Sequence, residues 1–183
     1  MLIGVIHSED RYDRLKRFQD DFKEQGIEDY LVFPAVFETT PQHGINKAHK
    51  QLIRYAKDYG FSEVCVFEDD VKFTHHNSFN YFLANKPQEF DIYLAGIYLG
   101  DIDENKRIKN DFAGFHCYIV HEKFYDTYLS VPDTEHIDRA LGGLGDFYVC
   151  HPFAAIQYNG FSDNTKREMT YDFLLERWEL HKG

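Results

Sequence analysis

The amino-acid sequence predicts an α/β fold in which helices flank both faces of a mostly parallel sheet, followed by a less regular C-terminal half. Short apolar runs alternate with helical patterns over residues 1–100, which is typical of such sheets. The run Val64–Phe67 is continuously apolar, as expected of a strand that is covered on both faces. The 183 residues fit one domain, which we divide into residues 1–100, residues 101–165 and a C-terminal helix or tail over residues 166–183.

The first elements follow from the spacing of apolar residues. The run Leu2–Ile6 predicts a buried first strand. The next segment predicts a helix, because apolar residues recur at helical spacing and a glycine follows them: Leu15, Phe18, Phe22 and Gly26. Residues 29–36 predict a second strand that stops at Pro34 or soon after.

Two helices and two strands are predicted in the next part of the chain. A helix over residues 45–60 carries its apolar residues on one face: Ala48, Leu52, Ile53 and Ala56. The third strand covers residues 63–71. A short helix over residues 76–87 and a fourth strand over residues 91–100 follow.

The remaining chain is less regular. A polar loop is predicted over residues 101–111, then a strand that changes into a helix at about Glu122. After Pro132 we expect a short helix, a glycine-rich turn and a late strand, Phe147–Val149.

Composition limits the classes of function. Twenty basic residues face thirty-one acidic ones, which gives a net charge of −11. This balance argues against a general nucleic-acid binder and against adhesion to anionic lipid, because both need a basic surface. An acidic protein that handles phosphates needs a metal ion or a local basic cluster.

The cysteines and the apolar segments point to an intracellular protein. Cys65, Cys117 and Cys150 each lie inside an apolar run and show no CxxC spacing, so we expect buried thiols. The N-terminus has no basic region before its short apolar run, and no segment reaches the ~20 apolar residues of a membrane span. We therefore expect a soluble, cytoplasmic protein without a transmembrane segment.

Three consecutive carboxylates, Glu68, Asp69 and Asp70, follow the apolar third strand. Like charges repel, and carboxylates are seldom buried without a partner. Because parallel sheets bind ligands at the carboxyl ends of their strands, this acidic triplet lies where a ligand is expected. Carboxylate oxygens suit Mg²⁺ or Mn²⁺, which would offset the repulsion and neutralise a diphosphate. The alternative is a strand end that simply faces water.

Basic and polar side chains are expected near the same edge of the sheet. Ser8, Arg11 and Arg14 follow the first strand, and arginine can bind phosphate with two parallel hydrogen bonds. Of the two arginines, Arg14 is the more typical of a solvated helix face. His49, near the start of the second helix, could point at a ligand or serve only in packing.

The order of these motifs resembles glycosyltransferase family 25, which includes bacterial lipooligosaccharide glycosyltransferases and collagen galactosyltransferases. The matching segments run in the family's order over roughly residues 2–162: VIHSEDRYDRL, FPAVFE, GINKAHKQL, EDDV, DIYLAG, GFHCYIV, IDRAL and HPFAAIQYNGFS. Phe37 and Glu38 depart from the family, which has an acidic residue and a glycine after the Ala-Val pair.

The resemblance implies a GT-A fold and inverting transfer of a hexose, commonly galactose from UDP-galactose, to an acceptor hydroxyl. By position, it implies that Asp69 and Asp70 bind the metal and diphosphate, with Glu68 in support. It also implies that five further residues contribute to the nucleotide-sugar site: Ser8, Asp10, Arg11, His49 and His116.

Inverting transfer needs a base within hydrogen-bond reach of the acceptor hydroxyl. Asp138 is our candidate and Asp146 the runner-up, since both lie in the irregular half that builds the acceptor side in this fold class. His151, just after the late strand, is the candidate third ligand of Mn²⁺ or Mg²⁺, with His136 as its competitor.

Two other classes of function stay open. The first is a nucleotide-sugar or metal-binding module of the same fold without transfer activity, which the change at Phe37 and Glu38 favours. The second is a nucleotidyltransferase, which the segment HSEDRYDR disfavours because it contains no glycine to form a phosphate-binding loop.

Overall fold

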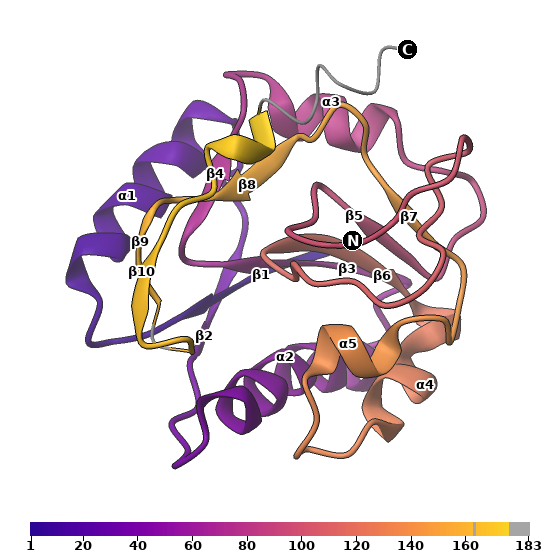
Figure 1. The fold of residues 1–183 in the computed structure, drawn as a ribbon, viewed down its shortest axis with the longest axis horizontal. Coiled ribbons are helices and arrows are strands. Elements are labelled where there is room, and N and C mark those ends of the chain that lie inside the picture. The colour runs from indigo at the N-terminus through magenta and orange to yellow at the C-terminus, as the bar shows by residue number, and fades with distance from the viewer. Residues whose placement is uncertain (163, 176–183) are drawn as a thin grey trace.

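The computed structural model describes residues 1–162 and 164–175, and it has a central six-stranded sheet between two layers of helices (Figure 1). The strand order is β2-β1-β3-β6-β5-β7. Their bounds are β1 Leu2–His7, β2 Leu31–Pro34, β3 Glu63–Glu68, β5 Ile92–Leu94, β6 Cys117–His121 and β7 Phe147–Val149. Only β6 runs opposite to its neighbours within this sheet, so the expected mostly parallel sheet is confirmed.

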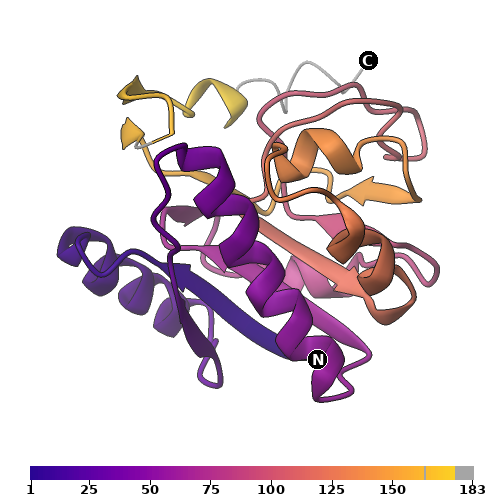
Figure 2. The ribbon, with the colours of Figure 1, turned by 90° about the horizontal axis from the view of Figure 1, so that it is seen from below.

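Helices cover both faces of the sheet, as expected. One face packs against α1 (Tyr12–Glu24) and α3 (Ser78–Ala84), and the other against α2 (Pro41–Asp58), α4 (Tyr125–Ser130) and α5 (Ile137–Leu141). A 3-10 turn, η1 (Glu122–Phe124), precedes α4. Figure 2 shows α2 running obliquely across its face of the sheet. Each helix places an apolar stripe on the sheet, so two separate apolar cores form, one on each face.

Two small antiparallel pairs lie outside the main sheet. β4 (Val71–Phe73) pairs with β8 (Ala155–Gln157), and β9 (Gly160–Ser162) pairs with β10 (Arg167–Met169). The first pair joins the chain directly after the acidic triplet to the C-terminal segment, so segments about 85 residues apart in the sequence contribute to the same region.

Several predicted boundaries are wrong because burial continues where regular structure does not. The predicted fourth strand over residues 91–100 is regular only over Ile92–Leu94, although Ala95 and Ile97 beyond it are buried. Likewise, the third strand ends at Glu68, and Asp69 and Asp70 form a turn before β4. Apolar residues such as Ile97 and Val71 thus identify buried positions, but they do not show that one strand continues to them.

The two ends of other predicted elements also differ. α2 begins at Pro41, since proline is well tolerated in the first turn of a helix. Of the C-terminal helix or tail expected over residues 166–183, the structure forms β10 first, residues 173–175 are helical, and the rest of that prediction lies outside the described residues. None of the helices described in residues 1–162 and 164–175 combines the length and apolar character needed to cross a membrane.

Gly44, in the predicted motif GINKAHKQL, has a packing role. A Cβ atom at this position would lie 2.0 Å from the backbone oxygen of Val36. The glycine therefore allows the first turn of α2 to approach the segment that follows β2, and it fixes the helix that carries His49.

Candidate active site

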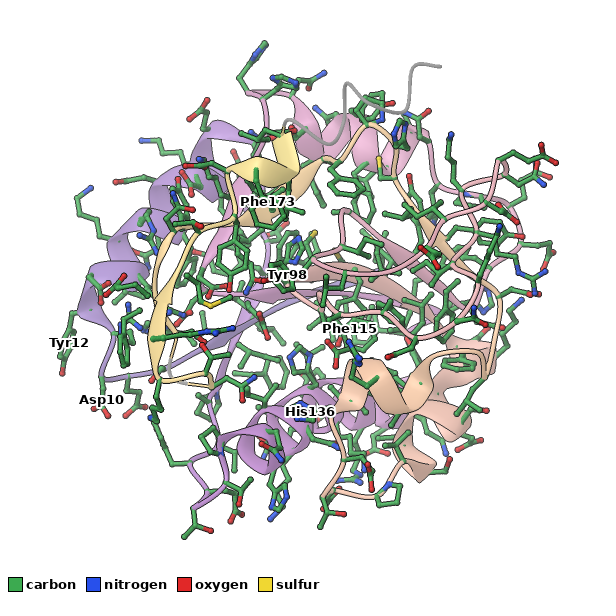
Figure 3. The ribbon with its side chains drawn as sticks, viewed as in Figure 1. Asp10, Tyr12, Tyr98, Phe115, His136 and Phe173 are labelled. Carbon is green, nitrogen blue, oxygen red and sulfur yellow. The ribbon has the colours of Figure 1, made fainter. Side chains whose placement is uncertain are left out.

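A cavity of about 570 Å³ opens at the carboxyl ends of β1 and β3. The chain passes from β1 to β2 on one side and places β3 on the other, so this edge is the point where the strand order reverses. Ligands of open α/β sheets bind at such points. Tyr98, Phe115 and His136 line the cavity, and they lie around the middle of the molecule in Figure 3.

Asp69 lies at the inner end of this cavity and is 4% exposed. Its carboxylate accepts hydrogen bonds from three donors: His7 Nδ1 at 2.7 Å, the backbone N–H of Ser8 at 3.0 Å and Arg14 Nη1 at 2.8 Å. Both oxygens are thus satisfied by protein groups from β1 and α1. Asp69 consequently joins the end of β3 to the start of α1.

Arg14 also binds the next carboxylate of the triplet. Its Nη1 lies 3.1 Å from Asp70 Oδ2, so one guanidinium nitrogen bridges two neighbouring acids. Burial and the Glu68 carboxylate nevertheless raise the pKa of Asp70 to about 7. One arginine therefore only partly offsets the repulsion within the triplet.

Glu68 begins a chain of hydrogen bonds that runs into the core. Its Oε1 lies 3.1 Å from His49 Nε2, and His49 Nδ1 lies 2.6 Å from the hydroxyl of Tyr118, which in turn lies 2.7 Å from the hydroxyl of Tyr128. Burial and the neighbouring Asp69 raise the pKa of Glu68 to about 8, and burial lowers the pKa of His49 to about 4. Near neutral pH this contact thus joins a protonated acid and a neutral imidazole.

Asp138, from the first turn of α5, lines the cavity together with the triplet. Its Oδ2 accepts a hydrogen bond from the backbone N–H of Gly114 at 3.1 Å, and its Oδ1 accepts one from the N–H of Arg139. Gly114 has a φ of +133°, and a Cβ atom there would lie 2.7 Å from the backbone nitrogen of Tyr98. This glycine lets its N–H point at Asp138, which fixes the carboxylate. The runner-up, Asp146, is paired with Arg107 and is not among the residues that line this cavity.

The expected nucleotide-sugar residues separate into two groups. Ser8 lines the cavity with the triplet. Asp10 lies at the outer edge of the molecule (Figure 3), and Arg11 precedes α1 and pairs with Asp13, so the structure places neither of them in this cavity.

Both expected histidines, His49 and His116, are 1% exposed and lie behind the cavity wall. Nε2 of His116 lies 3.1 Å from the carbonyl oxygen of Ala155, and burial lowers the pKa of its ring to about 4. Its backbone oxygen accepts the N–H of Glu68. These two residues thus support the triplet from behind.

The expected metal ligands are not brought together. The ring of His151 packs against Phe153, and its carbonyl accepts a hydrogen bond from Tyr81 of α3; it does not line the cavity, whereas its competitor His136 does. Each carboxylate oxygen of Asp69 already accepts at least one hydrogen bond from a protein donor. Within residues 1–162 and 164–175, no three His, Cys, Asp or Glu side chains are grouped to hold a metal ion. The donor set in this arrangement does not fit Mn²⁺ or Mg²⁺.

Sequence reasoning placed Arg14 near this edge but ranked it behind Arg11, and it missed two further side chains of the site, His7 and Gln157. Nε2 of Gln157 lies 3.4 Å from both Glu68 Oε2 and Asp70 Oδ1. A signal for Arg14 was present, because it lies one helical turn before the buried Phe18, whereas Arg11 precedes the helix. No local pattern brings Gln157 to the triplet, since that contact depends on the pairing of β4 with β8.

The fold defines the class of this protein as a mixed α/β, GT-A-like domain. No protein-family model matches the chain, and no curated protein matches its sequence. Among solved structures, A197 from STIV is 10% identical, with a TM-score of 0.55 over 92% of this chain and 93% of that one.

A second similar structure comes from Bacillus anthracis, a protein assigned as a glucose-1-phosphate thymidylyltransferase and solved in complex with a sucrose. It is 13% identical, with a TM-score of 0.51 over 82% of this chain and 86% of that one. At these identities the similarity shows the fold alone. The resemblance to glycosyltransferase family 25 is not supported as a family assignment.

Proposed function

We propose that the protein is a transferase that binds a nucleotide-sugar in the cavity and moves its hexose to an acceptor hydroxyl. The observation that carries this proposal is the pairing of a partly buried acidic triplet with Asp138 across one cavity at the reversal point of the sheet. A GT-A-like fold supports it, as does the order of motifs that resembles family 25. UDP-hexose is the proposed donor on the same grounds.

Each part of the cavity has a proposed role. Ser8 and Arg14 face the diphosphate, because a guanidinium and polar groups at a strand end suit phosphate oxygens. Tyr98 and Tyr171 contact each other edge to face, with ring centroids 5.5 Å apart, and they offer an apolar wall to a sugar ring.

Asp138 is the proposed catalytic base. As the acceptor oxygen forms its bond to the anomeric carbon, the hydroxyl proton passes to the Asp138 carboxylate. The bond from the anomeric carbon to the diphosphate breaks, and the nucleoside diphosphate leaves on the opposite face of the sugar, so the configuration inverts.

A thermal-shift panel of nucleotide-sugars tests the proposal, with Mn²⁺, with Mg²⁺ and with EDTA. We expect one donor class to raise the melting temperature and to release nucleoside diphosphate in the presence of hydroxyl acceptors. The three metal conditions test whether donor binding depends on a divalent cation. Absence of binding by every nucleotide-sugar in all three conditions would refute the proposal.

Nucleotidyl transfer is the second candidate, because the fold is shared with the Bacillus anthracis protein assigned as a glucose-1-phosphate thymidylyltransferase. Release of pyrophosphate from a nucleoside triphosphate and a sugar 1-phosphate would select it. Binding of nucleotide-sugars without any transfer or hydrolysis would select the inactive module that the sequence at Phe37 and Glu38 leaves open.

A further inference from the structure

A second cavity of about 250 Å³ lies beside the first, between α1 and the C-terminal segment. Figure 1 shows β9 and β10 lying along α1, and Arg14 Nη2 reaches the carbonyl oxygen of Phe161 at 3.5 Å. The two cavities share Arg14, Asp70, Ser162 and Tyr171 as lining residues. The two cavities therefore adjoin at these four side chains.

Three arginines spaced three residues apart line the second cavity: Arg11, Arg14 and Arg17. This concentration of positive charge is notable in a chain with a net charge of −11. Arg11 pairs with Asp13, and Arg14 pairs with Asp69 and Asp70. The charges of these two arginines are thus partly neutralised by neighbouring acids.

Arg17 differs from the other two. Its guanidinium carbon lies 4.0 Å above the ring of Tyr158, and within the described part of the chain no carboxylate approaches it to ion-pair distance. Its Nε is buried and has no hydrogen-bond partner there, and the same is true of Arg14 Nε. A half-buried guanidinium with unused donors is costly unless a ligand supplies the acceptor.

Among the described residues, the acidic side chains near the second cavity offset the charge of Arg17 only in part. Asp13 and Asp70 are engaged by Arg11 and Arg14, and Glu168 lies exposed on β10. Asp21, four residues after Arg17 on α1, accepts the hydroxyl of Tyr158 at 3.0 Å and interacts electrostatically with Arg17 without reaching ion-pair distance. The ring of Tyr158 thereby holds the Arg17 guanidinium in place.

We propose that the second cavity is a subsite for a phosphate or carboxylate group that the acceptor carries, with Arg17 as its principal ligand. A guanidinium binds both groups through parallel hydrogen bonds, which a lysine cannot form. The assignment to the acceptor rests on the proposed function, which puts the donor diphosphate on the other side of Arg14. The anion site itself rests only on the geometry around Arg17.

Inorganic phosphate is the probe for this site, titrated into the full chain at constant ionic strength and followed by backbone NMR shifts. We expect saturable shifts in residues 160–162 and in α1. Arg17→Gln should weaken phosphate binding at least tenfold. Lys16→Gln is the matched control, because it removes one positive charge from the same helix at a side chain that is 81% exposed. This variant should change the affinity for phosphate less than twofold.

Two further measurements keep the outcome decisive. Glu168→Gln removes an acid from the cavity wall and should strengthen phosphate binding, which tests the site even if Arg17→Gln does not fold. Phosphate should also bind in the presence of saturating UDP.

Absence of saturable phosphate binding, or equal affinity for phosphate in Arg17→Gln and wild type, would overturn the anion site. Competition between phosphate and UDP would overturn its assignment to the acceptor, and failure of every nucleotide-sugar to bind would refute the proposed function without affecting the phosphate result.

Discussion

Arg14 donates from Nη1 to Asp69 Oδ1 at 2.8 Å and to Asp70 Oδ2 at 3.1 Å. This contact answers the question that three consecutive carboxylates after a buried strand raise. The cation that stabilises them here is a side chain of α1, with His7 and the N–H of Ser8 as further donors to Asp69. The expected divalent cation is thus replaced, in this arrangement, by a guanidinium that is itself 14% exposed.

Removing this guanidinium should destabilise the fold. Arg14→Gln leaves the buried Asp69 with one charged donor fewer, and breaking a buried pair costs about 3 kcal/mol in unfolding free energy. Urea denaturation at pH 7 measures the loss. Lys16→Gln, which removes only an exposed pair with Asp20, should cost under about 0.5 kcal/mol. A loss below about 1 kcal/mol for Arg14→Gln would show that the contact contributes little.

The same substitution should make the triplet available to metal ions. Without the guanidinium, Asp70 Oδ1 and Glu68 Oε2 keep Gln157 Nε2 at 3.4 Å, while Glu68 Oε1 stays beside His49. Carboxylate oxygens of this kind suit Mn²⁺. Titration followed by the electron paramagnetic resonance signal of free Mn²⁺ should show tighter binding in Arg14→Gln than in wild type. The double variant Arg14→Gln, Asp70→Asn should lose that gain. Tighter binding by wild type than by Arg14→Gln would contradict the view that Arg14 occupies the place of the cation.

Glu68 should make the protein less stable as the pH rises. Its pKa is about 8 in the folded protein against 4.5 for the free side chain, so its contribution is complete below pH 4.5 and is lost as the pH rises through 8. Glu68→Gln keeps the shape of the side chain and removes the titration.

We therefore expect the free energy of unfolding of the variant to rise by about 2 kcal/mol relative to wild type between pH 5 and pH 8. This is less than the full pKa shift would give, because the Glu68 side chain is 24% exposed and solvent screens its charge. Denaturant unfolding at several pH values measures this difference. Glu24→Gln, at the exposed end of α1, is the control and should run parallel to wild type. Parallel curves for Glu68→Gln as well would exclude the raised pKa.

His116 should make the protein less stable as the pH falls, which is opposite to the effect of Glu68. Burial lowers its pKa to about 4 from 6.5, so the unfolded chain takes up a proton between these values while the folded protein does not, and stability falls as the pH drops from 6.5 to 4. His116→Gln retains a donor for the carbonyl of Ala155. Over this pH range its free energy of unfolding should fall by about 3 kcal/mol less than that of wild type. Unfolding of the exposed-histidine variant His76→Gln provides the baseline. An acid-induced loss in His116→Gln as large as that of wild type would argue against a buried neutral imidazole.

Asp138 is tested by a change that preserves its shape. Asp138→Asn should lower turnover by about 10²- to 10⁴-fold, because an amide cannot accept the acceptor proton, while the affinity for nucleotide stays within threefold. Asp146→Asn is the matched control, since Asp146 pairs with Arg107 and does not line the cavity. Normal turnover in Asp138→Asn would remove Asp138 from the mechanism.

The sequence alone was sufficient for the elements that have a strong local signal. The helix with Phe18 and Phe22 on its buried face, the glycine after it and the late strand Phe147–Val149 all lie where the pattern predicts. The fold class followed from their alternation. Predictions were wrong where buried coil has the same apolar composition as a strand, as around Ala95 and Ile97.

The site was only partly predictable, for a related reason. Position along the chain suggested that Ser8, the triplet and Asp138 meet, and each of them lines the cavity. Which arginine reaches the acids depends on where the helix begins, and which C-terminal side chain reaches them depends on strand pairing. His151 does not line the cavity, because β8, and not the loop before it, approaches the triplet through Gln157.

The reversed strand β6 has a consequence for how this domain can evolve. Although β6 belongs to the later part of the chain, it is inserted between β3 and β5 and is hydrogen-bonded to both. The amino-terminal portion therefore cannot complete its own sheet, and a hybrid made by exchanging residues 101–165 with those of another protein of this fold would also exchange a central strand. Exchange of whole halves is therefore expected to disrupt the sheet, whereas changes in loops and hairpins leave it intact.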